Sequence, residues 1–242
     1  MGMDDGRAAA APPRAARIEI PGGALLGDLR STPVTLAVVA GGIALLSVLL
    51  LLHAINKLLL GDGLFLAFDA DPNLPSWIQT ALFVVAGLGC WLLGWLRPEL
   101  RLPLAVLGLF AFALSCEQMV QVHKEVESSL GDLAMNVVQP LLALGLIAIV
   151  WLAGRGLPRL SQALLWGAIA SIAVAQGSSM VNAEFELPYA GLIFFQTLEE
   201  VGEMMTAILM IAAIAQPVLD AIAAKVLETR GAAAPAAAPA AR

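Results

Sequence analysis

The chain has 242 residues, of which 60% are hydrophobic and only 13% are charged, and its formal net charge is −6. Its mean hydropathy of +0.85 is typical of a chain that lies in lipid. A nucleic-acid or nucleotide partner is excluded by the lack of a basic surface and of a phosphate-binding loop in the sequence. Cys90 and Cys116 lie in separate apolar segments and form neither a CxxC motif nor a disulfide framework. We expect a polytopic protein of the lipid bilayer.

The predicted elements begin after residues 1–31, whose Ala, Pro, Gly and Arg residues show no periodicity and predict a disordered cytoplasmic tail without a signal peptide. An all-α, six-helix transmembrane domain is expected over 32–218, and an Ala/Pro-rich cytoplasmic tail over 219–242. Short links make consecutive helices antiparallel neighbours in one bundle. The apolar windows, each long enough to cross about 30 Å of hydrocarbon, are 33–57, 75–96, 102–123, 134–153, 160–182 and 188–217.

The distribution of basic residues predicts the orientation of the bundle. If the amino terminus is cytoplasmic, all of the 13 Lys and Arg residues except Lys57 and Lys124 lie on the cytoplasmic side. Cytoplasmic segments of membrane proteins are enriched in Lys and Arg. Both termini are therefore predicted to be cytoplasmic, in the bacterial inner (cytoplasmic) membrane, and the outer links are acidic.

Polar residues of the expected helices gather in the halves that face outward. This clustering predicts one polar pocket that opens to the outside and is shared by five helices. Acids inside a membrane are costly, at roughly 2.5–3.5 kcal/mol on insertion scales, and are usually tied to ion paths, proton relays or bound cations. The candidate pocket residues are His53, Glu117, Gln121, His123, Gln176, Asn182, Gln196, Glu199, Glu200 and Glu203.

The strongest signal is the run Glu199-Glu200-Val201-Gly202-Glu203 inside an apolar stretch. At 100° per residue, Glu199 and Glu203 lie on one helix face, Glu200 and Glu203 share a face more loosely, and Glu199 and Glu200 diverge. Two of the carboxylates can face one centre, where either a shared proton or a cation must neutralise them. Gly202 allows another helix to approach closely. An alternative is that the acids only fix helix register by hydrogen bonds to Gln176 or Asn182.

The sequence is compatible with several ligands at this site. A divalent metal ion (iron, zinc or copper) could be held by Glu117, His123, Glu200 and Glu203, with Glu199 nearby. A pair of histidines on facing helices, His53 and His123, could instead ligate a b-type haem. A further group on one helix face, Cys116, Met119 and His123, could bind copper, although ordinary packing of Met and Cys produces the same spacing.

Three sequence motifs carry a resemblance to a known family. They are the stretch Phe68–Trp77, Ser115-Cys116-Glu117 with His123 downstream, and the run Glu199–Met204. Together they resemble an uncharacterised family of bacterial multi-pass membrane proteins, over roughly residues 40–215. In that family an Asp is usual where Cys116 stands. The resemblance implies that Glu117, His123 and the late glutamates belong to one site, and it implies no activity.

Three functions follow as hypotheses. The first is transport or sensing of a cation or protons by the glutamate site, with the acidic outer links attracting positive ions. The second is a membrane-embedded metalloenzyme that acts on a lipid-soluble small molecule. The third is a haem-carrying or accessory subunit, with membrane-protein partners or a homo-oligomer. No nucleophile elbow, zinc-protease helix or dinucleotide fingerprint is found in the sequence.

Overall fold

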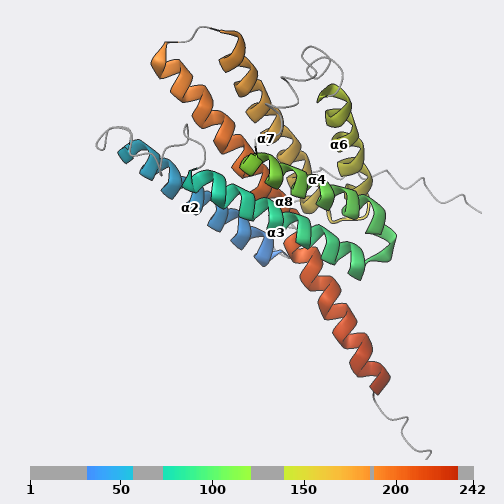
Figure 1. Cartoon of the computed structure of the whole chain (residues 1–242). Coiled ribbons are helices and arrows are strands. Elements are labelled where there is room, and N and C mark those ends of the chain that lie inside the picture. Colours follow the sequence, from blue (N-terminus) through green and yellow to red (C-terminus); the bar gives the residue numbers. More distant parts are fainter. Residues whose placement is uncertain (1–31, 57–72, 121–138, 186–187, 234–242) are drawn as a thin grey trace, which may run out of the picture.

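The chain forms a helical bundle in which every regular element of the described residues is a helix (Figure 1). The computed structural model describes residues 32–56, 73–120, 139–185 and 188–233. The all-helical prediction is therefore confirmed for these ranges. The helices are α2 (Pro33–Ile55), α3 (Leu74–Leu96), the 3-10 turn η3 (Pro98–Leu100), α4 (Arg101–Val120), α6 (Gln139–Gly154), α7 (Arg159–Glu184) and α8 (Tyr189–Ala233).

Five of these helices, α2, α3, α4, α7 and α8, are long and apolar enough to cross a membrane. The sixth, α6, has 16 residues, fewer than the roughly 20 that a span needs. Its predicted start at residue 134 lies outside the described ranges, so the sixth span stays a prediction. The predicted tail 1–31 also lies outside the described residues.

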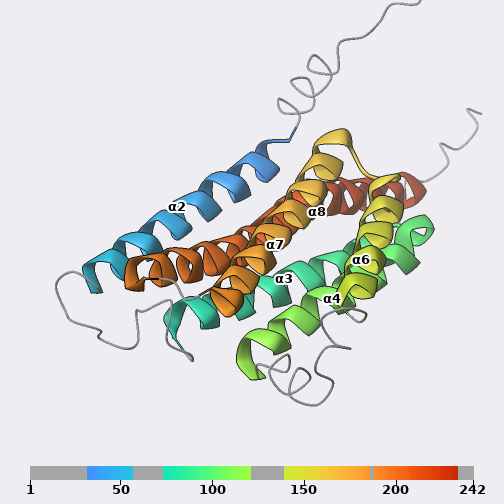
Figure 2. The ribbon, with the colours of Figure 1, turned by 90° about the horizontal axis from the view of Figure 1, so that it is seen from above.

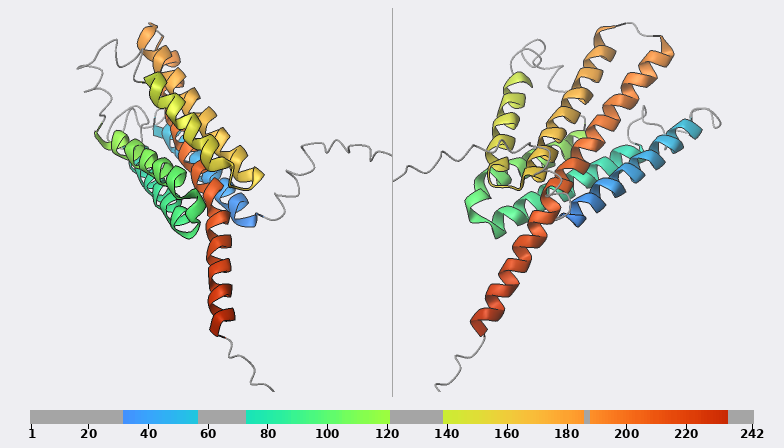
Figure 3. Two further views of the ribbon diagram at one scale, coloured as in Figure 1. Left: turned by 90° about the vertical axis from the view of Figure 1, so that its right-hand side faces the viewer. Right: turned by 180° about the vertical axis from the view of Figure 1, so that it is seen from behind.

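Helix α8 is much longer than its apolar window predicted. It runs for 45 residues, passes Pro217 and ends at Ala233. Proline in a helix leaves one carbonyl without its usual partner, which transmembrane helices tolerate when neighbours compensate. Residues 219–233, which the sequence assigned to a tail, are thus the last turns of α8. They project beyond the other helices in Figure 1 and Figure 3.

The centre of the bundle is α8, which contacts α7 most extensively and then α3 and α2. Figure 2 shows α8 running between α2 and α7, with α3 and α4 paired beside it. The peripheral helix is α6, which has only limited contacts with α4 and α7. One side of α8 therefore meets α2 and α3, and another meets α7.

Local sequence features set the starts and crossings of these helices. The first turn of α3 is capped by Asn73, whose Oδ1 accepts hydrogen bonds from the Ser76 N–H at 2.7 Å and the Ser76 hydroxyl at 2.8 Å. The pairing of α3 with α4 depends on Gly87 and Gly108, because a Cβ on either would lie 3.0 Å or less from the backbone oxygen of the other. Small residues of this kind let transmembrane helices approach closely.

Candidate functional site

Contacts between α3 and α8 fix how deep the glutamates lie. The side-chain Nε2 of Gln79 donates a hydrogen bond of 2.7 Å to Oε2 of Glu203. Further along both helices, a Cβ on Gly89 would lie 2.5 Å from Ile214. The two helices therefore run parallel, and Glu203 is level with the second turn of α3.

Contacts between α2 and α8 run in the opposite direction. The Thr35 hydroxyl donates to the carbonyl of Ala212 at 3.1 Å, and Gly42 lies against the side chain of Ile208. Continuing along both antiparallel helices brings His53 level with the region of α8 around Thr197, just before Glu200. The ends of α2 and α3 that the charge pattern assigns to the outside therefore meet the glutamate turns of α8.

Polar side chains form a column along the seam where α2, α3 and α8 meet, in the halves that the charge pattern predicts to face outward. Glu200 and Glu203, both half-buried, provide its ionisable groups on α8. Successive members on one helix are three residues apart, close to one helical turn. The column members on α2 and α3 are at most 7% exposed: His53, Asn56, Asn73, Ser76 and Gln79.

Several atoms of this column have no hydrogen-bond partner among the described residues. They are both side-chain polar atoms of Asn56, the Nδ2 of Asn73 and the Oε1 of Gln79. Leaving a buried polar group unsatisfied costs about 1–3 kcal/mol. Three fully buried amides with unused donors or acceptors indicate a place for water, protons or a small cation.

The column ends at one depth on all three helices. Below His53, α2 presents buried Leu49, and below Gln79, α3 presents Phe83. On α8, Met204 and Ile208 follow the glutamates and pack with α2 in a separate apolar cluster. The half of the seam beside the glutamates is thus polar, and the other half is apolar.

The glutamates of α8 are directed toward different neighbouring helices. Glu200 continues the row of Met204 and Ile208, which faces α2, whereas Glu203 is bonded by Gln79 of α3. Glu199 lies two turns before Thr206, whose hydroxyl reaches the Ala168 carbonyl of α7 at 3.3 Å. Glu200 and Glu203 therefore belong to the column, and Glu199 lies on the α7 side.

Close packing of α8 on α7 depends on Gly202, as the sequence predicted. A Cβ at this position would lie 2.8 Å from the Ser171 carbonyl oxygen and 3.0 Å from the Ala175 Cβ. Glycine beside the acids therefore brings the backbones of α7 and α8 together and holds Glu199, Glu200 and Glu203 at a fixed depth.

The remaining predicted pocket residues are dispersed. Glu117 is half-buried on α4, and Ser115, two residues earlier, bonds the Thr80 carbonyl of α3, which places Glu117 level with Gln79. Gln176 is exposed on α7 and so is not an interior residue. Asn182 and Gln196 are half-buried, near the outer ends of α7 and α8. Gln121 and His123 lie outside the described residues.

The metal and haem hypotheses remain predictions. Across 32–56, 73–120, 139–185 and 188–233, no group of three His, Cys, Asp or Glu residues could hold a metal ion. The predicted set of Glu117, Glu199, Glu200 and Glu203 therefore does not form such a group by itself. His123, which both hypotheses need, lies outside these ranges.

Sequence reasoning missed the α3 side of the column. Asn73, Ser76 and Gln79 follow one another at intervals of three residues in the first turns of α3. Such spacing places polar groups on one helix face. Attention to this interval would have predicted a polar face on α3 that includes Gln79, although not the helix that this face meets.

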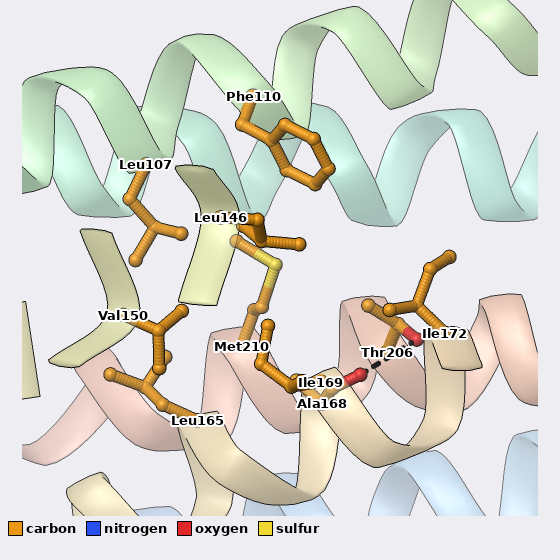
Figure 4. Close-up of a pocket in the computed structure, with 10 residues that line it drawn as sticks. All are labelled: Leu107, Phe110, Leu146, Val150, Leu165, Ala168, Ile169, Ile172, Thr206 and Met210. Atoms are coloured by element: carbon orange, nitrogen blue, oxygen red, sulfur yellow. Dashed lines mark hydrogen bonds between the residues drawn. The ribbon is translucent and has the colours of Figure 1, made fainter. Parts of the chain in front are cut away.

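A second feature is an apolar cavity enclosed by α4, α6, α7 and α8 (Figure 4). Its one polar lining group is Thr206, whose hydroxyl is bonded to the carbonyls of Gly202 at 2.8 Å and Ala168 at 3.3 Å. The cavity thus presents no unsatisfied side-chain polar group to a ligand. It lies level with the apolar half of the α2/α3/α8 seam.

Comparison of the chain with protein-family models, curated proteins and solved structures found no match. The class that the geometry defines is a helical protein with several helices apolar enough to span a membrane.

Proposed function

We propose that the protein lies in the bacterial inner membrane and binds and releases protons at Glu203, as part of transport or sensing. The observation that carries this proposal is the 2.7 Å hydrogen bond from fully buried Gln79 to Glu203. Ionisable groups inside transmembrane segments are costly and mark ion or proton paths. A carboxylate held by a neutral amide accepts a proton without losing an ion-pair partner at that contact.

The chemistry of Gln79 suits both protonation states of Glu203. With Glu203 ionised, the amide Nε2 donates, as observed. With Glu203 protonated, a flip of the amide lets Oε1 accept the proton of the carboxyl group instead. The unused Oε1 of Gln79 in the present state is the acceptor that this exchange requires.

Neighbouring charges favour exchange of a proton over a permanent charge. Glu200 and Glu203 lie about one turn apart, and two nearby carboxylates do not both ionise cheaply in a medium of low dielectric constant. The imidazole of His53, on the same seam, has one nitrogen that donates and one that accepts a hydrogen bond when it is neutral. The column therefore holds proton donors and acceptors in succession from the outer ends of α2 and α3.

The inner ends of the helices support the proposed orientation, with both termini cytoplasmic. The Arg155 guanidinium lies 3.4 Å from the centre of the Trp151 ring, and Lys225 lies 5.9 Å from that of Trp95. Basic and aromatic residues of this kind are typical of the cytoplasmic interface. The Arg97 guanidinium also donates a hydrogen bond of 3.2 Å to the Gly156 carbonyl, which joins the link between α3 and α4 to the link between α6 and α7.

Proton flux into proteoliposomes tests the proposal directly. Vesicles that contain the protein and an internal pH-sensitive dye are given a potassium diffusion potential with valinomycin. We expect the wild type to acidify the interior, Glu203→Gln to abolish this flux and Gln79→Leu to reduce it. The matched control is Glu99→Gln, at an exposed inner turn.

A sensor would show no flux but would still respond to pH. Trp77 lies next to Ser76 of the column, so its fluorescence reports changes there. We expect a pH-dependent signal that Glu203→Gln removes. If both flux and fluorescence are the same in wild type and Glu203→Gln, the proposal is wrong. Elemental analysis of the same preparation separates proton binding from metal binding: a stoichiometric metal lost in Glu203→Gln would contradict the proton assignment.

A further inference from the structure

We infer that the link between α3 and α4 and the link between α6 and α7 together form a binding surface for the headgroup of an anionic phospholipid. This link surface consists of residues 97–101 and 155–159. It lies at the opposite end of α3 from the column, so it is separate from the proton site. It adds a lipid partner that the proton proposal does not require.

The two links touch each other. The Arg97 guanidinium donates a hydrogen bond of 3.2 Å to the Gly156 carbonyl, and a Cβ on Gly156 would collide with the side chain of Leu100. The links accordingly lie side by side in Figure 1 and Figure 2. Arg101 directly follows Leu100, and Arg159 lies three residues after Gly156. The contact therefore brings the first residues of α4 and α7 to one surface.

The link surface has an excess of positive charge. Four of its residues are arginines and one, Glu99, is an acid. Glu99 is paired with Arg97 at 2.8 Å, which leaves three positive charges. The guanidinium of Arg155 lies 3.4 Å from the centre of the Trp151 ring. The two others, at positions 101 and 159, are exposed and form no ion pair with a residue that the structure describes. Charge complementarity thus selects an anion as the partner.

The positions of Arg101 and Arg159 in their helices strengthen this preference. Each is the first residue of a long helix, where the positive end of the helix dipole disfavours a cation and attracts an anion. Neither α4 nor α7 has an acid in its first turn. A bound anion compensates both the arginine charges and the dipoles, and no acidic side chain of these first turns does so.

The depth of the link surface selects a lipid over a soluble anion. The links adjoin α3, α4 and α7, which are long and apolar enough to cross a membrane, so they lie at the level of the headgroups. Trp95 and Trp151 beside the links are exposed, and exposed tryptophan is typical of this level. Lys225 of α8 lies 5.9 Å from the centre of the Trp95 ring and adds a further positive charge. Exposed Leu102 and Leu152 continue the surface along α4 and α6 and offer apolar contacts to acyl chains.

The distribution of the arginines over two links favours a headgroup with two phosphates. Guanidinium groups bind phosphate oxygens in a bidentate manner, so one arginine side chain can engage one phosphate. A lipid with two phosphates, such as cardiolipin, can contact Arg101 and Arg159 at once. A lipid with a single phosphate leaves one of the two links without a partner.

Native mass spectrometry of the full chain in a neutral detergent tests the inference. The protein is titrated with cardiolipin, phosphatidylglycerol and phosphatidylcholine that carry the same acyl chains. We expect one cardiolipin to bind per chain, more tightly than phosphatidylglycerol. Phosphatidylcholine, whose headgroup has no net charge, is expected to bind the weakest of the three.

Single arginine variants locate the bound lipid. Arg101→Gln and Arg159→Gln are each expected to weaken cardiolipin binding about fivefold, which is the contribution of one basic residue near an anionic headgroup. The matched control is Arg230→Gln, which removes the same charge from the part of α8 that projects beyond the other helices in Figure 1. This variant is expected to bind cardiolipin like the wild type. Thermal unfolding of each variant checks that it is folded.

Three results would overturn the inference. If Arg230→Gln weakens binding as much as Arg101→Gln, the lipid is attracted by net charge and not by the link surface. Wild-type binding by folded Arg101→Gln and Arg159→Gln would show that the links hold no lipid. Equal binding of cardiolipin and phosphatidylcholine by the wild type would exclude a charged headgroup, and this comparison decides if a variant is unfolded.

Inorganic phosphate separates a lipid headgroup from a soluble anion. An excess of phosphate is added to the cardiolipin complex, and chloride at the same ionic strength is the control. We expect the two salts to have the same small effect, because acyl chains contribute to the affinity of the lipid. Displacement of cardiolipin by phosphate and not by chloride would mean that the links bind free phosphate, and the lipid assignment would be wrong.

Discussion

Two regions beside α8 differ in whether their buried polar groups are hydrogen-bonded. In the column, Asn56, Asn73 and Gln79 are fully buried and retain side-chain atoms without partners in the described part of the chain. In the cavity, the single hydroxyl of Thr206 is bonded twice. Unsatisfied buried polar groups are costly and rare. Apart from those of Thr80 on α3 and Asn182 on α7, the buried side-chain atoms of this kind among the described residues lie in the column, which distinguishes this region from the packed region around the cavity.

The largest expected effect comes from breaking the close contact between α7 and α8 at Gly202. Gly202→Val places side-chain atoms where the Ser171 carbonyl and the Ala175 side chain already lie. Overpacking of this kind costs typically 1–3 kcal/mol, and here a backbone atom blocks relaxation, so we expect about 3 kcal/mol. Unfolding by dodecyl sulfate in mixed micelles measures this loss.

The matched control for Gly202→Val is a glycine without close neighbours. Gly177 lies on α7, and a Cβ there would meet nothing within 4 Å. Gly177→Val is expected to change the free energy of unfolding by less than about 0.5 kcal/mol. Similar losses in the two variants would show that α7 and α8 do not pack as closely as Gly202 implies.

Gln79→Leu is expected to have a smaller effect that is confined to the column. It leaves the half-buried carboxylate of Glu203 without its amide donor, and hydrogen bonds to charged groups contribute about 1.5–3 kcal/mol. We expect a loss of about 2 kcal/mol when Glu203 is ionised and a smaller loss when it is protonated, because the lost bond then joins two neutral groups. The same unfolding assay over pH measures both.

A double-mutant cycle with Gln79→Leu and Glu203→Leu sharpens this prediction. Because the two side chains contact each other, the double variant is expected to lose less stability than the sum of the single variants. The control pair combines Gln79→Leu with Ser47→Ala, an exposed α2 hydroxyl that bonds only its own helix. Additive losses in both pairs would mean that Gln79 and Glu203 act independently.

Much of this arrangement follows from the sequence, because it depends on local rules. The apolar windows predicted six spanning helices, of which five are long and apolar enough in the structure to cross a membrane. The gathering of polar residues toward one end of the helices indicated the end at which the column lies, although it predicted a pocket shared by five helices. The close approach at Gly202 was also predictable, since glycine beside acids has few other uses in a transmembrane helix. These are properties of single helices or of helix depth.

Features that depend on which helices become neighbours could not be predicted. Nothing in α8 shows that Glu203 meets α3 rather than α4, so Gln79 was missed and Gln176 was assigned to the interior. Continuation of α8 past Pro217 was missed for a related reason. Proline and a falling hydropathy predict a helix end, whereas the Thr35 and Val34 contacts with Ala212 and Gln216 support the helix at this point. Contacts between distant segments decided these outcomes.

The smallest effect is expected from Thr206→Val, which tests the cavity side of the comparison. The Thr206 hydroxyl shares its proton between the carbonyls of Gly202 and Ala168. Valine keeps the shape and makes the wall of the cavity fully apolar. Side-chain hydrogen bonds within membrane proteins average about 0.6 kcal/mol, so we expect a loss near that value.

Thr197→Val provides the matched control for Thr206→Val. Thr197 makes a single bond of 2.8 Å to the Ile193 carbonyl of its own helix. If the bond to Ala168 contributes, Thr206→Val loses more than Thr197→Val, yet clearly less than Gln79→Leu. A loss from Thr206→Val as large as that from Gln79→Leu would mean that the cavity depends on its hydroxyl as strongly as the column depends on its amide. The division of α8 into a polar and a dry side would then not hold.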